Sequence, residues 1–219
     1  MSIQMLSLLA DAGFETAYMV LAALSIGTLL GAPLGVLLAT SGRGELFPLP
    51  AFNRVVGALV NATRSIPFII LAVAIIPFTR LVAGTSIGTS AAIVPLTVAA
   101  TPFIARIIEG AVRGVDAGLI EAAQAMGAKP LQIVFKVLLP EALPAIVLGL
   151  TLTTVLLIGY SAMVGAVGGG GLGDLGIRYG YQRFRPDVMA SVVVVLIAVV
   201  QLIQTAGDRL ARRLNKRVR

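Results

Sequence analysis

The side chains that most often perform chemistry in proteins are sparse in this sequence. It contains neither cysteine nor histidine among its 219 residues. Their absence excludes thiol nucleophiles, Cys/His metal sites and every triad or general base that depends on imidazole. The lysines follow Ala128, Phe135 and Asn215, so none closes the Gly-x-x-x-x-Gly-Lys-Ser/Thr loop that cradles the phosphates of ATP. The sequence therefore predicts no catalytic site, no metal site and no cofactor of its own.

Charged residues gather in residues 106–141, between stretches apolar enough to cross a bilayer. Asp116 can cap a short helix there, and Gly127 suits its end. Lys129 followed by Pro130 suits the start of a second helix. The apolar residues expected on one face of the first helix are Leu119, Ile120, Ala123 and Met126. The pattern predicts two short helices joined by a sharp turn, and from amphipathicity alone the first could equally lie passively on lipid.

The elements that must position this segment are membrane spans. Hydrophobic residues make up 58% of the chain and charged residues only 12%, which leaves too little polar surface for a water-soluble globule. A bilayer core needs roughly 20 apolar helical residues. The windows free of Asp, Glu, Lys and Arg are 16–42, 65–79, 81–105, 142–173 and 188–207. We therefore expect an all-α membrane protein with five transmembrane helices, as a single domain over residues 1–219, with the first span retained rather than cleaved.

The second window is short, and it becomes a span only if it extends back through Arg64 into the apolar run 55–60. We expect Arg64 about one turn or more inside the cytoplasmic boundary, from which its side chain can snorkel to the interface. Prolines are expected to bend or break their helices, and broken helices commonly line a pathway, although membrane helices also contain ordinary prolines. These prolines are Pro33, Pro67, Pro77, Pro95 and Pro102. A further pair, Pro140 and Pro144, is expected to end the second short helix before the next span.

Glycines mark two further regions. Gly27, Gly31 and Gly35 share one helix face, which favours close packing against another helix of the same chain. Residues 165–176 hold too many glycines for a continuous helix, so a non-helical loop is expected near the outer mouth. It could shape a gate, receive a binding protein or simply connect two spans. Tyr160 and Met163 precede it and could face a pathway or pack in the core.

The basic residues predict the orientation of the chain. With five spans and the N-terminus outside, most of the 17 lysines and arginines lie on the cytoplasmic side, as the positive-inside rule requires. The basic C-terminal tail, which includes Lys216, Arg217 and Arg219, is expected to meet anionic membrane lipid rather than nucleic acid.

Several motifs resemble those of known permeases. Glu121-Ala122-Ala123 with Gly127, followed by Leu139-Pro140, resembles the cytoplasmic loop of ABC importer permeases. Other stretches look like the permeases of methionine importers in particular. They begin at Arg64-Ser65-Ile66-Pro67, Ile76-Pro77-Phe78, Gly84-Thr85-Ser86, Ala92-Ile93-Val94-Pro95 and Gly159-Tyr160-Ser161-Ala162-Met163. The resemblance covers most of the chain, from about residue 14 to 210.

The resemblance implies a type I ABC importer permease fold in the bacterial inner membrane, with residues 106–141 as the loop that carries a coupling helix. It implies a homodimer, two copies of an ABC ATPase subunit that uses ATP and Mg²⁺, and an extracytoplasmic methionine-binding protein. The expected cargo is D- and L-methionine. The residues expected to contact the ATPase are Leu119, Glu121, Ala122, Ala123, Met126 and Gly127. Candidates for the pathway or its gate are Arg64, Pro67, Tyr160, Ser161 and Met163.

The alternative is an ion-coupled secondary amino-acid transporter. Such a protein normally holds Asp, Glu or His within its spans to bind the coupling ion, and the five windows contain none. Backbone carbonyls could still bind sodium, so the alternative is weakened rather than excluded. The Thr-Val-Gly-Tyr-Gly filter of potassium channels does not occur in the sequence.

Overall fold

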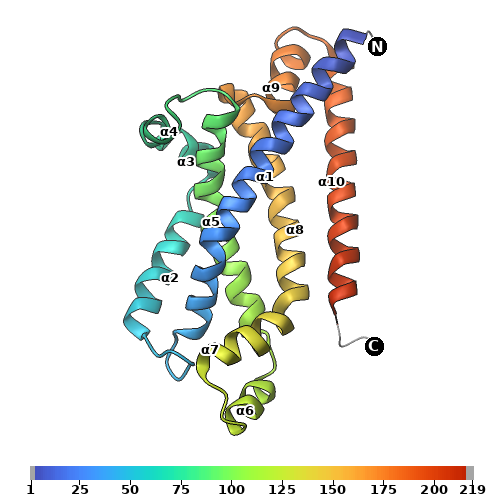
Figure 1. Ribbon diagram of the computed structural model, residues 1–219. Helices are drawn as coiled ribbons and strands as arrows, with labels where there is room; N and C mark the ends of the chain where they lie inside the picture. The colour runs from blue at the N-terminus through green and yellow to red at the C-terminus, as the bar shows by residue number, and fades with distance from the viewer. Residues whose placement is uncertain (1–2, 216–219) are drawn as a thin grey trace.

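The computed structural model describes residues 3–215, and all regular elements within that range are helical. The long helices run side by side in an elongated bundle (Figure 1). In chain order the elements are α1 (Ile3–Thr40), α2 (Pro50–Arg64), α3 (Phe68–Ala74), α4 (Ile76–Ala83), α5 (Thr89–Arg113), α6 (Ala117–Ala125), α7 (Pro130–Ile133), the π-helical η1 (Val134–Leu138), α8 (Leu139–Val164), η2 (Gly165–Gly169), α9 (Gly171–Leu175), η3 (Gly176–Tyr181) and α10 (Pro186–Leu214). The expected tail residues Lys216, Arg217 and Arg219 lie outside the described residues.

Four helical runs are long and apolar enough to cross a membrane: Met5–Thr40, Thr89–Arg113, Pro130–Gly169 and Pro186–Leu214. A fifth crossing is possible if α2 and α3 count as one span, which is bent by 100° between Arg64 and Phe68. The all-α membrane architecture expected from the sequence is confirmed, and the expected second span corresponds to the bent pair of α2 and α3.

The contact between α1 and α5 forms the centre of the bundle, and glycines set its closeness. A Cβ atom on Gly31 would lie 2.7 Å from the carbonyl oxygen of Thr101, and one on Gly35 would lie 2.5 Å from that of Ala105. No real Cβ tolerates such distances, so the glycine face of α1 lies directly on the α5 backbone. The expectation of packing within one chain is confirmed.

The prolines behave differently from one another. α5 continues as a single helix through Pro95 and Pro102, so the expectation of a broken helix is wrong there. α1 also continues through Pro33, where only a bend was expected. Pro140 and Pro144 do not end a helix either, because α7, η1 and α8 form one helical run. The π turn of η1 ends two residues before Pro140, and such local widening can accommodate a missing backbone donor.

The glycine-rich segment after α8 folds into short helical pieces rather than an open loop. The helix breaks at Val167 and Gly168, as the glycine content predicts, and then turns into α9. α1 holds the turn in place, because the Glu15 carboxylate accepts a hydrogen bond from Gly171 N at 2.6 Å and Thr16 Oγ1 accepts one from Leu172 N at 2.9 Å. This segment lies at the end of the bundle where α1 begins, opposite α6 (Figure 1).

Candidate coupling site and pathway

The local sequence of α6 defines both ends of this helix. Asp116 Oδ1 accepts a hydrogen bond from Gly118 N at 2.7 Å, which caps the N-terminus. Gly127 adopts a φ of 76°, and Ala128 N donates to Ala123 O at 3.0 Å, which closes the C-terminus with a left-handed turn. The next helix starts at Pro130, where Gln132 Oε1 accepts from Lys129 N at 2.9 Å. The first predicted short helix is confirmed, whereas the second is wrong as a separate helix, because α7 continues through η1 into α8.

The segment 106–141 is less of a loop than its charges suggest. Its first residues, up to Arg113, extend α5, and its last residues belong to the run that begins at Pro130. α6 and its two flanking turns form the projecting part, at one extreme end of the bundle (Figure 1). The projecting helix is therefore held between two membrane-crossing helices, so a force applied to it would act on both of them.

The residues expected on α6 have different exposures. Leu119 is 43% exposed and Met126 is 82% exposed, and Ala122 lies between them on the same helix face. Glu121 and Gly127 are also exposed. Ala123 is only 4% exposed and belongs to the buried core. The structure therefore leaves five of the six expected coupling residues accessible, whereas Ala123 fixes α6 to the body of the protein.

A cavity of about 590 Å³ lies between α6 and the connection from α1 to α2. Arg43 and Glu45 line it from that connection, and Ile120 and Gln124 line it from α6. On this side α6 is thus separated from α1 and α2. Its attachment to the bundle runs through the end of α5 and through α7 and η1.

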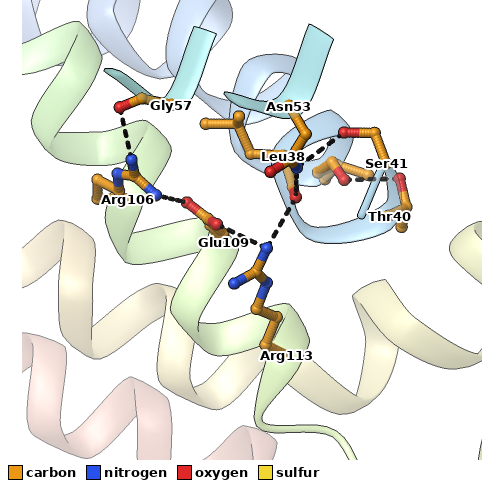
Figure 2. A network of polar contacts seen from close by, with 9 residues as sticks. Leu38, Thr40, Ser41, Asn53, Gly57, Arg106, Glu109 and Arg113 are labelled. Carbon is orange, nitrogen blue, oxygen red and sulfur yellow. Dashed lines mark hydrogen bonds and ion pairs between the residues drawn. The ribbon is translucent and has the colours of Figure 1, made fainter. Parts of the chain in front are cut away.

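Beside this cavity, the last two turns of α5 carry a charged network (Figure 2). The side chain of Glu109 is 6% exposed, and its two oxygens bind Arg106 at 2.5 Å and Arg113 at 3.1 Å. Arg106 also donates to Gly57 O of α2 at 2.7 Å, and Arg113 donates to Leu38 O of α1 at 3.2 Å. The network therefore ties α5 to both neighbouring helices.

Asn53 of α2 completes the network. Its Nδ2 donates to Leu38 O at 2.7 Å and to Ser41 Oγ at 3.0 Å. Sequence reasoning missed these contacts, although the spacing of Arg106, Glu109 and Arg113 places all three on one face of a helix. The acceptors are largely backbone carbonyls of other helices, which leave no mark on the sequence.

The break between α2 and α3 brings several pathway candidates together. Arg64 and Tyr160 line one cavity of about 100 Å³. The Arg64 guanidinium lies 5.3 Å from the centre of the Phe103 ring, and Tyr160 stacks on Phe68 with ring centres 4.2 Å apart. Pro67 lies at the bend and precedes the first residue of α3.

Arg64 lies well inside the bundle, level with the middle of α5. It ends a helix of 15 residues that starts at Pro50, and it faces Phe103 near the middle of α5. An exposed arginine at such depth has to face water or protein rather than acyl chains. The break at Ser65–Pro67 provides that opening because it turns the chain aside before it reaches the far end of the bundle.

The two remaining candidates differ. Met163 is 47% exposed in the last turn of α8. Ser161 is 3% exposed, and its hydroxyl donates to Ile158 O at 2.7 Å within the same helix. Ser161 therefore offers no free group to a passing molecule in this structure, and Met163 does not line the cavity of Arg64 and Tyr160.

A bundle of up to five apolar crossings, with a short exposed helix projecting from one end, has the architecture of a membrane permease driven by a separate subunit. The chain belongs to the family described as the binding-protein-dependent transport system inner membrane component, whose model matches residues 31–219. It is a multi-pass permease subunit of an ABC importer, and this membership does not favour an ion-coupled secondary transporter.

Individual relatives cover nearly the whole chain. A probable D-methionine transport system permease protein of Vibrio cholerae is 56% identical over 210 residues, which are 96% of this chain and 93% of the relative. The D-methionine transport system permease protein of Escherichia coli K12 is 52% identical over 99% of this chain and 100% of its own. The methionine import system permease protein of Bacillus subtilis is 43% identical over 94% and 93%.

Solved structures agree with this family. A chain of the MetNI methionine ABC transporter, in a structure described as inward facing, matches with a TM-score of 0.96 and 52% identity over 99% of this chain and 100% of that one. A chain of an amino acid ABC transporter solved with histidines matches with a TM-score of 0.74 at 19% identity, over 97% of this chain and 100% of that one. The second likeness extends the fold to more distant importers.

Proposed function

We propose that this chain is the permease of a methionine importer and that two copies of it enclose the translocation pathway. The observation that carries this proposal is the likeness, along nearly the whole chain, to a methionine ABC transporter. Both D- and L-methionine are the expected cargo. The likeness to an inward-facing structure further supports a pathway open toward the cytoplasm in the conformation described.

The proposed energy source is ATP hydrolysis by two copies of a separate ABC ATPase subunit, each of which receives one α6. The exposed stripe of Leu119, Ala122 and Met126 supports this role, because an amphipathic helix with an unburied apolar face suits a groove on a partner. Glu121 adds a charged contact beside the stripe. Gly127 permits the reversal that returns the chain to the membrane.

The proposed topology has the N-terminus outside and the end of α10 in the cytoplasm, with residues 1–219 as one transmembrane domain. α6 and the end of α10 lie at the same end of the bundle, which supports this arrangement (Figure 1). An extracytoplasmic methionine-binding protein then docks at the opposite end, near α4, α9 and η3. Membrane lipid surrounds the apolar surface of α10, because only 11% of its most apolar 18-residue stretch is buried within the protein.

We assign Arg64, Pro67, Tyr160 and Met163 to the pathway or its gate. The exposed Arg64 guanidinium in the bent second span supports this assignment, because a second copy of the chain can enclose the opening and keep it from lipid. We assign Ser161 a packing role, because its side chain is buried and its hydroxyl is bonded within α8.

Reconstitution tests the function directly. The permease, its ATPase subunit and its binding protein are placed in liposomes, and uptake of labelled L- and D-methionine is measured with and without ATP. We expect accumulation that requires all three proteins and ATP. Uptake by the permease alone, driven by a proton or sodium gradient, would show the proposal to be wrong.

The role of α6 is tested with Glu121→Lys. We expect this charge reversal to reduce the amount of ATPase that copurifies with the permease, and to lower ATP-driven uptake about tenfold or more, because like charges brought together at a docking contact cost several kcal/mol. Glu45→Lys makes the same charge change at the same end of the molecule, outside α6, and should leave ATPase recovery near normal. Full ATPase recovery and uptake with Glu121→Lys would remove α6 from the docking site.

A further inference from the structure

The charged network at the end of α5 is built around an acid that the bundle buries. A carboxylate as enclosed as Glu109 is stable only when it is paired and hydrogen bonded. Arg106 and Arg113 supply both pairings, one to each oxygen. Because all three residues belong to α5, pairing alone would stabilise only that helix.

Each arginine also reaches out of α5 to the backbone of another helix. Leu38 O is one of the last four carbonyls of α1, which a helix leaves without donors of its own, and Arg113 and Asn53 both donate to it. Arg106 donates to Gly57 O in the middle of α2. Glu109 orients both guanidinium groups for these contacts, so it holds three helices in a fixed relation without contacting two of them (Figure 2).

The network lies on the route by which a movement of α6 would reach the other helices. Arg113 is the last residue of α5, and three residues later the chain starts α6. The cavity of about 590 Å³ keeps α6 away from the connection between α1 and α2. A displacement of α6 therefore reaches α2, and through it the bend beside Arg64, by way of the last turns of α5.

One atom of the network is not satisfied in this conformation. The Nε of Arg106 is buried, and it has no hydrogen-bond partner among the described residues. A buried donor without an acceptor is costly, so it calls for a structural explanation. An arginine that changes hydrogen-bond partners between two states of the permease would leave such a donor unpaired in one of them.

We propose that Glu109 is a positioning residue that couples the movement of α6 to α1 and α2 by holding Arg106 and Arg113 against their backbone carbonyls. This proposal rests on the docking role of α6 proposed above, and it goes further by naming the contacts that pass the movement on. Glu109 touches neither cargo nor ATPase. Its loss should therefore separate ATP hydrolysis from transport while the complex stays assembled.

The test uses Glu109→Gln in the reconstituted complex of permease, ATPase and binding protein. Glutamine keeps the size of the side chain and one acceptor oxygen but removes the charge that holds two guanidinium groups. We expect the ATPase to copurify at the normal ratio, and the ATP hydrolysed per methionine imported to rise about fivefold, within the range by which single residues change coupling between sites. Asp208→Asn, which removes an exposed carboxylate of α10 outside the network, is the control and should leave the ratio unchanged.

A second variant covers the case in which Glu109→Gln fails to insert or fold. Asn53→Ala removes one of the two donors to Leu38 O without unpairing a charge, and it should raise the same ratio about twofold. When both single variants are assembled, their combination should raise the ratio by less than the product of the two effects, because both act on one joint.

The outcomes separate the two proposals. A normal ratio of ATP to methionine in Asn53→Ala and in any assembled Glu109→Gln complex, even with a lower temperature of unfolding, would reduce the network to a structural brace and overturn the inference. Loss of ATPase binding in Glu121→Lys alongside that result would leave the docking role of α6 intact. Normal ATPase binding in Glu121→Lys would overturn the docking role of α6, on which the role of Glu109 rests.

Discussion

At Gly35 the backbones of α1 and α5 approach so closely that a methyl group has no room. We expect Gly35→Ala to force the two helices apart and to destabilise the permease by about 1–3 kcal/mol, the usual effect of overpacking, because the added Cβ would meet the carbonyl of Ala105 at 2.5 Å. Thermal unfolding in detergent measures the effect as a lower midpoint temperature.

Gly13→Ala in the same helix is the control for this prediction. No atom lies within 4 Å of the Cβ that it would add, so it should be neutral or slightly stabilising. Equal midpoints for the two variants would contradict the packing argument.

Single residues that act locally were predictable, whereas those that act across helices were not. Asp116 and Gly127 define α6 through contacts within a few residues, so their types and spacing were sufficient to predict them. Glu109 differs, because its role in linking helices depends on where the carbonyls of Leu38 and Gly57 lie in space. Ala123 was also misleading, since a small residue on an amphipathic helix is equally compatible with a partner's surface and with the core.

At the scale of elements, prolines could not reveal which helices break. At Pro67 the chain turns because Ser65 already ends α2, with both its N–H and its hydroxyl bonded to Asn61 O, and Ile66 is non-helical before the proline. At Pro95 and Pro102 the same residue type lies inside α5, where packing against α1 keeps the helix continuous. Tertiary contacts decide between these outcomes, and one sequence does not contain them.

The short helix α3 depends on its stacked ring to keep its place against α8. We expect a double-mutant cycle with Tyr160→Ala and Phe68→Ala to give a coupling of about 1 kcal/mol beyond the loss of buried area, because the rings are parallel with centres 4.2 Å apart. The coupling is measured from unfolding of the two single variants and the double variant in detergent. Tyr160→Phe retains the ring and should retain most of the stability, and additive single effects would show that the stack does not hold α3.

At the scale of the whole molecule, the topology can be tested with single cysteines because the natural chain has none. Met126 and Phe184 are 82% and 88% exposed. Met126 directly follows α6 and Phe184 lies just before α10, and α6 and the start of α10 lie at opposite ends of the bundle (Figure 1). We expect a membrane-impermeant maleimide added outside intact spheroplasts to label Phe184→Cys and to leave Met126→Cys unmodified until the membrane is opened. The reverse pattern would invert the proposed orientation.

The bend in the second span also bears on how the protein assembles in the membrane. A lone copy embedded in the bilayer presents the Arg64 guanidinium at a depth where an arginine costs about 2.5–3.5 kcal/mol. A second copy that encloses Arg64 would remove this cost, so the bend favours association of two copies in the membrane.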